Sequence, residues 1–333
     1  MQTVMFHETV FGPIHSRRLG TSLGVNLSPV DGKTCTFDCL YCEAGFNAQG
    51  PGKAGLPARA EVARQLDQRL RQMKEAGQRL DVITFSGNGE PTLHPDFAGI
   101  IDDTLALRDR DYPEAKVSVL TNSTRIFTPE VAAALERVDN NILKLDSAVE
   151  ATMRAIDRPN APGFSVDRVV EGLKRFSDTG IIQTMMLRGQ WEGQEFDNTT
   201  DTEVGALIEA YRRIRPREIM LYSLDRPTPA NTLRKVPLDE LQPYVQDALD
   251  LIEFANGPVT STWGKVRADM GHPAPFNLKM IAVGNEQWGK QYPERLEVFI
   301  KAIRAKYPKM LIVGSSGPSA SGDKFDYLWP EMK

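Results

Sequence analysis

Six short apolar runs alternate with segments of helical periodicity between residues 20 and 224, and this alternation constrains the fold more than any other feature. The runs occupy residues 22–27, 81–87, 116–122, 141–147, 181–187 and 218–224. The helical segments occupy residues 58–77, 94–110, 128–138, 165–180 and 199–214. Nearly continuous apolar strands joined by helices predict an α/β fold, with a parallel sheet covered by helices.

Six such units are compatible with a partial (βα)6 barrel or with a doubly wound sheet. We expect the partial barrel of parallel strands. In both arrangements the polar residues that follow the strands gather at one edge of the sheet, where ligands bind. The residues after each run are therefore the first candidates for a site.

All three cysteines, Cys35, Cys39 and Cys42, lie in the segment DGKTCTFDCLYCEAG after the first run. Thiolates are suitable ligands for iron-sulfur clusters and for zinc. A closed zinc site needs four protein ligands, and none of the four histidines stands at the local spacing of a zinc finger. A four-iron cluster held by three cysteines keeps one iron without a protein ligand, where a substrate or cofactor can coordinate. The odd, tightly spaced set also indicates a reducing compartment rather than a disulfide framework.

The C-x3-C-x2-C spacing, with Tyr41 before the last cysteine, resembles the signature of the radical S-adenosylmethionine superfamily. The segment SGNGEPTLHP after the second run is similar to the Gly-Gly-Glu-Pro element of that family. The matching residues are Gly87, Asn88, Gly89, Glu90 and Pro91. The resemblance implies that this element holds the amino group of the methionine moiety. Glycines let the backbone approach a ligand, and Glu90 can anchor the loop or accept a hydrogen bond.

The same resemblance implies the chemistry. A 4Fe-4S cluster on the three cysteines would bind S-adenosyl-L-methionine and cleave it reductively, and the resulting 5'-deoxyadenosyl radical would abstract hydrogen. An external electron donor of the flavodoxin or ferredoxin type is the implied partner. The substrate stays open between a small molecule, a protein and RNA. Activation of a partner protein by installing a radical on it is the alternative within this chemistry.

Other polar residues follow later runs. The family resemblance assigns such positions to the ribose or carboxylate of S-adenosylmethionine or to the substrate, and it makes Asn122 and Asp146 candidate cofactor contacts. The alternative is that these residues cap loops and helices, and we favour this for Gln183. Lys144 is a further polar residue at the end of the same run, two positions before Asp146. His94 follows the glycine-rich turn and is either a site residue or the start of a helix.

Residues 10–235 resemble, more narrowly, bacterial radical S-adenosylmethionine proteins related to wyosine-tRNA synthesis. The resemblance is carried by GPIHSRRLGTSLGVNLSPVDGK, NNILKLDSA, RAIDRPN and YSLDRPTPANTL. A link to tRNA is an analogy only. We assign residues 1–235 to a radical S-adenosylmethionine domain.

Residues 237–333 resemble the middle of the catalytic barrel of α-L-arabinofuranosidases of glycoside hydrolase family fifty-one. We expect strands at 250–257, 279–289 and 310–316 and a helix at 293–308, which together form a truncated fragment of a (β/α)8 barrel. By this resemblance Asn285 contacts a sugar hydroxyl and Glu286 is the general acid/base. The nucleophile would lie on a later strand, so we expect no arabinofuranosidase activity.

Two interpretations of the junction near residue 237 are open. One is an accidental joining of two coding sequences, which we favour. The other is a genuine fusion in which the borrowed βα units extend an open edge of the parallel sheet.

A net charge of −4 and a pI near 5.7 give no electrostatic footprint of a polyanion-binding protein, although a local basic patch is still compatible with one. No apolar stretch approaches the roughly 18 residues of a membrane span. We therefore expect a soluble cytoplasmic protein without a membrane partner.

Overall fold

The computed structural model describes residues 4–16, 20–224, 228–234, 242–283 and 291–313. The chain separates into two compact units, residues 1–236 (unit 1) and 237–333 (unit 2). Each unit has a hydrophobic core of its own.

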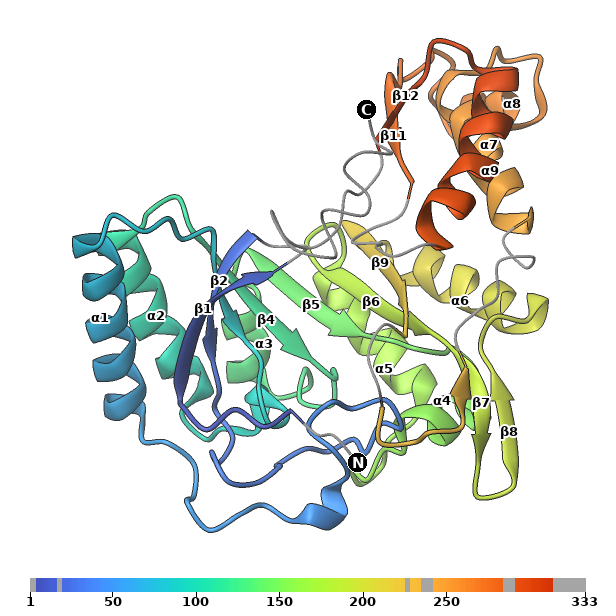
Figure 1. The fold of residues 1–333 in the computed structure, drawn as a ribbon. Coiled ribbons are helices and arrows are strands. Elements are labelled where there is room, and N and C mark those ends of the chain that lie inside the picture. The colour runs from blue at the N-terminus through green and yellow to red at the C-terminus, as the bar shows by residue number, and fades with distance from the viewer. Residues whose placement is uncertain (1–3, 17–19, 225–227, 235–241, 284–290, 314–333) are drawn as a thin grey trace. The chain divides into compact units, whose positions relative to one another are not determined.

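Unit 1 is built on a seven-stranded sheet with the order β1-β2-β3-β4-β5-β6-β9 (Figure 1). Its strands are β1 (Val10–Ser16), β2 (Gly20–Val25), β3 (Val82–Phe85), β4 (Lys116–Thr121), β5 (Asn140–Lys144), β6 (Ile181–Met186) and β9 (Glu218–Ser223). Within this sheet, the strands β2, β3, β4, β5, β6 and β9 are parallel to their neighbours. The edge strand β1 pairs with β2 in the antiparallel direction. The six parallel strands coincide with the six apolar runs, which confirms the predicted α/β sheet. The edge strand β1 was not predicted.

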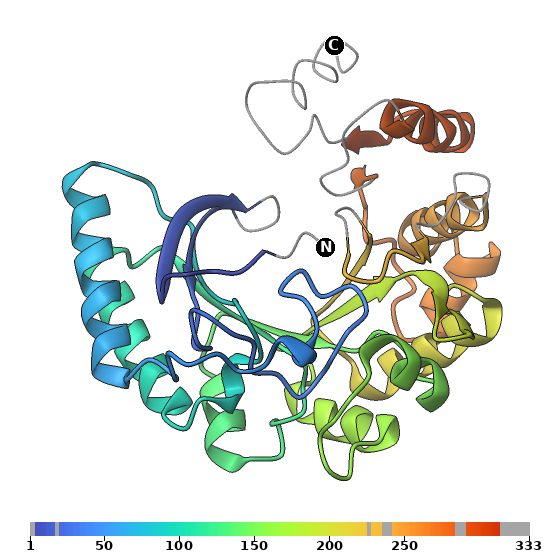
Figure 2. The ribbon, with the colours of Figure 1, turned by 60° about the horizontal axis from the view of Figure 1, so that its bottom comes forward.

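Helices follow the strands and cover the outer side of the curved sheet (Figure 2). They are α1 (Arg59–Glu75), α2 (Phe97–Asp111), α3 (Pro129–Leu135), α4 (Glu150–Asp157), α5 (Val166–Leu173) and α6 (Asp201–Ile214). Five of them correspond to the predicted segments, and α4 does not. The fourth predicted segment is helical only to Leu173, because the chain then tightens into a 3-10 turn that buries Phe176. The small sheet of β7 (Arg188–Trp191), β8 (Gln194–Asp197) and β10 (Leu233–Arg234) was also not predicted.

The two faces of the large sheet differ in polarity. Ile83 and Phe85 of β3 are fully buried, and the Phe85 ring lies 6.5 Å from that of Phe97 on α2. Each such side chain stabilises the fold by about 1.5–3 kcal/mol. On the other face Ser22 and Thr84 share a 2.9 Å hydrogen bond at the wall of a pocket of about 200 Å³. The apolar face therefore fixes the helices, and the opposite face is free to hold a ligand.

Unit 2 contains the parallel pair β11 (Met280–Ala282) and β12 (Leu311–Val313) and the helices α7 (Gln242–Asn256), α8 (Thr262–Asp269) and α9 (Gln291–Lys306). The strands predicted at 279–289 and 310–316 and the helix at 293–308 are present as β11, β12 and α9. The strand predicted at 250–257 is wrong, because these residues end α7. Ile252 and Ala255 are buried three residues apart while Leu251 is 54% exposed, which is helical spacing.

Asn285 and Glu286 lie outside the described residues. Their predicted roles stay predictions. Within the described ranges, no helix has the length and apolar character that crossing a membrane requires.

Candidate functional site

The cysteine loop, residues 31–45, is joined to the glycine-rich segment 87–91 at the carboxyl-terminal edge of the sheet. Thr34 and Gly89 form a parallel bridge, and the Glu90 amide donates to the Thr34 carbonyl at 2.9 Å. The Thr34 amide donates in turn to the Asn88 carbonyl at 3.3 Å. The two motifs follow the adjacent parallel strands β2 and β3, so the sheet itself brings them together.

The three cysteines are free thiols arranged around one buried cation. Cys39 is buried, and Cys35 and Cys42 are partly buried. The Lys33 ammonium donates to the Gly45 carbonyl at 2.7 Å. Burial opposes the charge of Lys33, but the negative potential of all three sulfurs raises its pKa. Lys33 also lies 3.6 Å from the Asp38 carboxylate, so the loop holds a buried cation between an acidic side chain and the sulfurs.

Burial raises the pKa of the Cys35 thiol to about 12, and the nearby Glu90 carboxylate adds to the effect. Burial raises the pKa of Cys39 as well. Metal binding would therefore release protons from these thiols. No three His, Cys, Asp or Glu side chains in the described ranges converge as ligands of a single metal ion. A four-iron cluster takes each thiolate on a different iron, and three soft donors beside a cation fit that group.

The carboxyl end of α4 clamps the cysteine loop through its backbone. The bonds run from Leu40 N to Ile156 O at 3.0 Å, from Asp38 N to Asp157 O at 2.9 Å, and from Asn160 N to Thr36 O at 2.9 Å. These partners belong to the RAIDRPN segment, residues 154–160. The structure gives that segment a physical role, because it fixes the backbone on both sides of Cys39 and next to Cys35.

Arg158 ends α4 in the left-handed conformation, with φ 47°. Its guanidinium lies 3.6 Å from the Asp38 carboxylate. It also lies 5.5 Å from the centre of the Phe46 ring and 5.9 Å from that of Trp191. Arg158 thus ties the cysteine loop to the β7 strand by charge and by cation–π contact.

The glycine-rich segment leaves no space for side chains at its glycines. A Cβ at Gly89 would stand 1.9 Å from the Thr34 carbonyl oxygen, and one at Gly87 would stand 2.4 Å from Asn26 Oδ1. Asn88 is fully buried, and its amide nitrogen donates to the Pro29 carbonyl at 3.0 Å. It also exchanges hydrogen bonds with the Phe6 backbone. The Asn88 side chain therefore has a structural role in place of the usual glycine.

Gly89→Ala is expected to displace the cysteine loop, because the clash is with backbone rather than with a movable side chain. We expect a loss of about 2 kcal/mol in the free energy of unfolding, typical of overpacking, and a protein that retains less iron. Urea unfolding and iron analysis measure the two effects. Gly205→Ala on α6 is the matched control, because no atom lies within 4 Å of the added Cβ. Equal behaviour of the two variants would contradict this account.

Glu90 anchors the segment. Its Oε1 accepts hydrogen bonds from the Thr92 amide at 3.1 Å and from the hydroxyls of Thr92 and Thr121, and its Oε2 accepts from the Asn122 amide at 2.7 Å. Burial raises the pKa of Glu90 more than these bonds lower it. Pro91 follows as the first residue of a short 3-10 turn, Pro91–Leu93. Glu90 thus joins the end of β3 to the end of β4.

Asn122 links this anchor to the cysteine loop through a closed ring of hydrogen bonds. Its amide nitrogen donates to Thr36 Oγ1 at 2.9 Å and contacts Cys35 Sγ at 3.6 Å. The Thr124 hydroxyl donates to Asn122 Oδ1 at 2.7 Å. The Thr36 hydroxyl therefore donates to Thr124 Oγ1, 2.7 Å away. The structure thus places Asn122 beside Cys35, and its predicted contact with the cofactor stays a prediction.

Tyr41 and Asp146 meet in a buried charged network beside Cys39. The Tyr41 hydroxyl donates to Asp146 Oδ2 and accepts from the Lys144 ammonium, and it lies 3.3 Å from Asp157 Oδ1. Lys144 Nζ is 3.3 Å from Asp146 Oδ2. Burial opposes the charge of Lys144, but the Asp146 carboxylate raises the pKa of this lysine. For Tyr41, burial and the Asp146 carboxylate both raise the pKa. Sequence reasoning missed Asp157 altogether.

His94 takes the structural role that the sequence left as one alternative, whereas the capping role favoured for Gln183 stays a prediction. His94 Nδ1 accepts from the Asp96 amide at 3.1 Å, so its Nε2 donates to the Pro57 carbonyl at 2.8 Å. Both ring nitrogens are therefore used within the fold. Gln183 lines the inner pocket of about 200 Å³.

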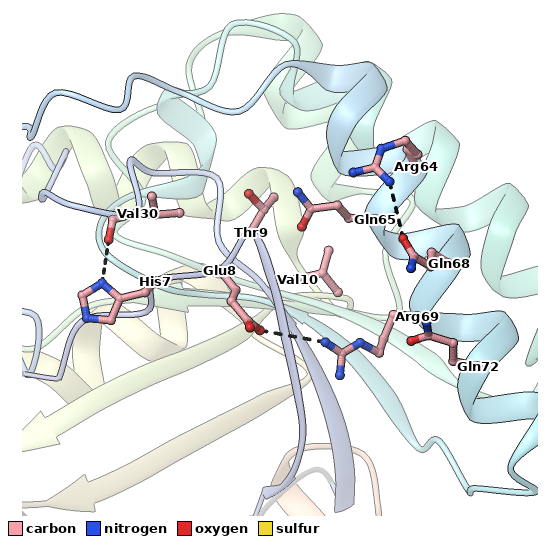
Figure 3. Close-up of a pocket in the computed structure, with 10 residues that line it drawn as sticks. All are labelled: His7, Glu8, Thr9, Val10, Val30, Arg64, Gln65, Gln68, Arg69 and Gln72. Atoms are coloured by element: carbon pink, nitrogen blue, oxygen red, sulfur yellow. Dashed lines mark hydrogen bonds and ion pairs between the residues drawn. The ribbon is translucent and has the colours of Figure 1, made fainter.

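A second pocket, of about 490 Å³, lies between the amino-terminal segment and α1 (Figure 3). Its two arginines already have partners. Arg64 binds Glu61 at 2.7 Å, and Arg69 donates to the Gly12 carbonyl at 2.6 Å and lies 3.9 Å from Glu8. It contains none of the predicted site residues.

The model of the radical SAM superfamily matches residues 30–202, more than half of the chain. A UPF0026 protein of Synechocystis sp. is 32% identical over 227 residues, which cover 66% of this chain and 77% of that protein. A solved structure of TYW1 with a lysine-pyruvate adduct bound is 16% identical, with a TM-score of 0.47, and the match covers 69% of this chain and 74% of that one.

The model of the alpha-L-arabinofuranosidase 1 domain matches residues 188–331 and so begins within unit 1. The extracellular exo-alpha-L-arabinofuranosidase of Streptomyces chartreusis is 52% identical over 90 residues. These cover 27% of this chain but 11% of that enzyme, so the chain spans only a fragment of it. Because the radical SAM superfamily model covers more than half of the chain, the chain belongs to the radical S-adenosylmethionine superfamily of enzymes, and its carboxyl-terminal part is similar to a fragment of an arabinofuranosidase.

Proposed function

We propose that unit 1 binds a 4Fe-4S cluster through Cys35, Cys39 and Cys42 and uses it to cleave S-adenosylmethionine reductively. The observation that carries the proposal is the direct backbone bonding between the loop that holds all three cysteines and the glycine-rich segment. The three cysteines would each bind one of the four irons, and S-adenosylmethionine would bind the fourth iron.

The bound cluster would supply one electron to the sulfonium of S-adenosylmethionine. This reductive cleavage would release methionine and supply the 5'-deoxyadenosyl group that abstracts hydrogen from the substrate. The chain's own residues position the reactants. Gly87 and Gly89 let the backbone approach the methionine moiety, and Glu90 and Asn122 hold that backbone in place.

Asp146, Tyr41 and Lys144 are proposed to fix the far wall of the cofactor site. Asp146 Oδ1 accepts from the Met185 amide at 2.9 Å, so the carboxylate also ties β5 to β6. Lys144 is 14% exposed and is the member of this network most accessible to a bound ligand. Its ammonium would favour an anionic group such as a carboxylate.

The inner pocket is proposed to admit the substrate group that reacts. Its lining includes Phe11, Ile14, Leu120 and Met220, together with hydroxyl side chains and Gln183, and none of its lining residues is charged. Such walls favour an uncharged, largely apolar group over a phosphate or a carboxylate.

Anaerobic reconstitution with iron and sulfide tests the proposal. We expect a brown protein that produces 5'-deoxyadenosine and methionine when it is reduced in the presence of S-adenosylmethionine. Iron and sulfide analysis and chromatography of the products measure this. A colourless protein that binds zinc in preference to iron would disprove it.

For unit 2, the 52% identity to an arabinofuranosidase makes glycoside hydrolysis the second candidate. Retaining hydrolysis needs two carboxylates about 5 Å apart, and the resemblance supplies only the segment around Glu286. We therefore expect no release of product from a chromogenic arabinofuranoside. Release that disappears in Glu286→Gln would show instead that the second carboxylate is present.

A further inference from the structure

A third pocket of unit 1, of about 290 Å³, lies against the cysteine loop and is named here the arginine pocket. Its lining includes Thr36, Thr124, Arg125, Phe127, Ser165 and Arg168. Thr36 directly follows the cluster-ligand candidate Cys35. The pocket therefore has the cysteine loop as one of its walls.

The two arginines of this pocket are exposed and form no ion pair within the described residues. Their neighbours behave differently: Arg175 pairs with Glu136 at 2.6 Å, and Arg213 lies 3.8 Å from Asp167. The Arg168 guanidinium instead lies 4.5 Å from the centre of the Phe127 ring, which is 40% exposed. Two uncompensated guanidinium groups and an exposed aromatic ring are the features of a surface that binds an acidic protein.

A short chain of contacts connects this surface to a thiol. Thr36 Oγ1 and Thr124 Oγ1, on the pocket wall, are 2.7 Å apart. The Asn122 amide nitrogen lies 2.9 Å from Thr36 Oγ1 and 3.6 Å from Cys35 Sγ. The side chains of Thr36 and Asn122 thus connect the pocket wall with the Cys35 sulfur.

We propose that the arginine pocket is the docking site of an acidic one-electron carrier protein and that the electron enters the cluster at Cys35. The inference rests on the proposed function, because it requires a cluster on the three cysteines. The carrier is oxidised by one electron and the cluster is reduced by one electron, with no bond formed or broken. Arg125 and Arg168 steer and hold the acidic surface of the carrier, and Phe127 packs against it.

The test compares the rate of cluster reduction by reduced flavodoxin in the wild type and in Arg125→Ala/Arg168→Ala, both reconstituted and followed by stopped-flow absorbance. At low ionic strength we expect the variant to be slower by about tenfold, because steering by complementary charge has effects of this order. Added salt should slow the wild type and reduce the difference. Reduction by the methyl viologen radical cation should not be slowed, since it needs no positive docking surface.

Arg71→Ala/Arg212→Ala is the matched control, because it removes the same charge from exposed positions on α1 and α6. We expect it to be reduced at nearly the wild-type rate. Arg125→Lys/Arg168→Lys keeps the charge and should retain most of the rate, so a lysine variant as slow as the alanine variant would contradict an electrostatic role.

A wild-type rate in the alanine variant, with loss of inorganic phosphate binding in calorimetry, would assign the pocket to a phosphorylated ligand and overturn the proposal. A wild-type rate without any phosphate binding would overturn it as well. A wild-type protein that holds no cluster would refute the proposed function itself. Iron analysis therefore separates the two failures before any rate is measured.

Discussion

Replacing Cys35, Cys39 and Cys42 together by alanine is expected to abolish iron binding and with it all formation of 5'-deoxyadenosine. The wild type should hold about four iron atoms and four sulfides per chain, the content of a cubane cluster, and the triple variant should hold none. The loss should be complete because these are the only cysteines of the chain, so no other thiolate can take their place. Iron and sulfide analysis and visible absorbance after anaerobic reconstitution measure it.

The fold should survive this change. Substitutions away from large core side chains typically cost about 1 kcal/mol, and two of the three cysteines are only partly buried. The loop also keeps its bonds to the α4 end and to Gly89, which are backbone bonds. Circular dichroism provides the control, and the single variants should already bind less iron. A triple variant that remains brown would place the cluster elsewhere.

The sheet could be predicted from the sequence because each parallel strand is a short run with several apolar residues, and helical segments alternate with these runs. The helix α4 could not, because it has only eight residues and its best-buried members, Met153, Ile156 and Asp157, include a charged one. Its position is set by contacts with the cysteine loop, which is more than 100 residues earlier in the chain. For residues 250–257, a family resemblance gave a strand where the three-residue apolar spacing itself indicates the helix α7.

In the candidate site, too, some contacts could be predicted from the sequence and others could not. The meeting of the cysteine loop with the glycine-rich segment follows from the order of β2 and β3 in a parallel sheet. By contrast, the contacts of Tyr41 with Lys144 and Asp157 join residues 103 and 116 positions apart, and no local pattern encodes them. In the sequence, Asp157 is indicated only weakly as a site residue: it is a charged residue at a position where helical spacing from Met153 predicts an apolar one. The hydrogen-bonded ring around Asn122 depends on hydroxyl orientations that appear only in three dimensions.

Glu90→Ala is expected to have the largest effect on stability among the single changes in the site. The carboxylate accepts four hydrogen bonds, and it is 4% exposed, so water cannot easily replace it. Its removal leaves two buried backbone amides without an acceptor. Each unsatisfied buried group costs about 1–3 kcal/mol, so the expected loss for unit 1 is about 3 kcal/mol. Because Asn122 is one of the donors, the contact with Cys35 should loosen as well.

Hydrogen exchange at the amides of Thr92 and Asn122 measures this locally, which avoids assuming that two units unfold in one step. Both amides should exchange much faster in Glu90→Ala. Glu90→Gln keeps the shape of the side chain but turns an NH2 group toward at least one donor. The loss of stability in this variant should therefore be intermediate between that of the wild type and that of Glu90→Ala. Glu114→Ala, at an exposed glutamate, is the control and should change stability by less than about 0.5 kcal/mol. If Glu90→Ala protected these amides as well as the wild type does, Glu90 would not be the anchor, and a direct contact with the methionine moiety would be left as the reason for a glutamate at this position.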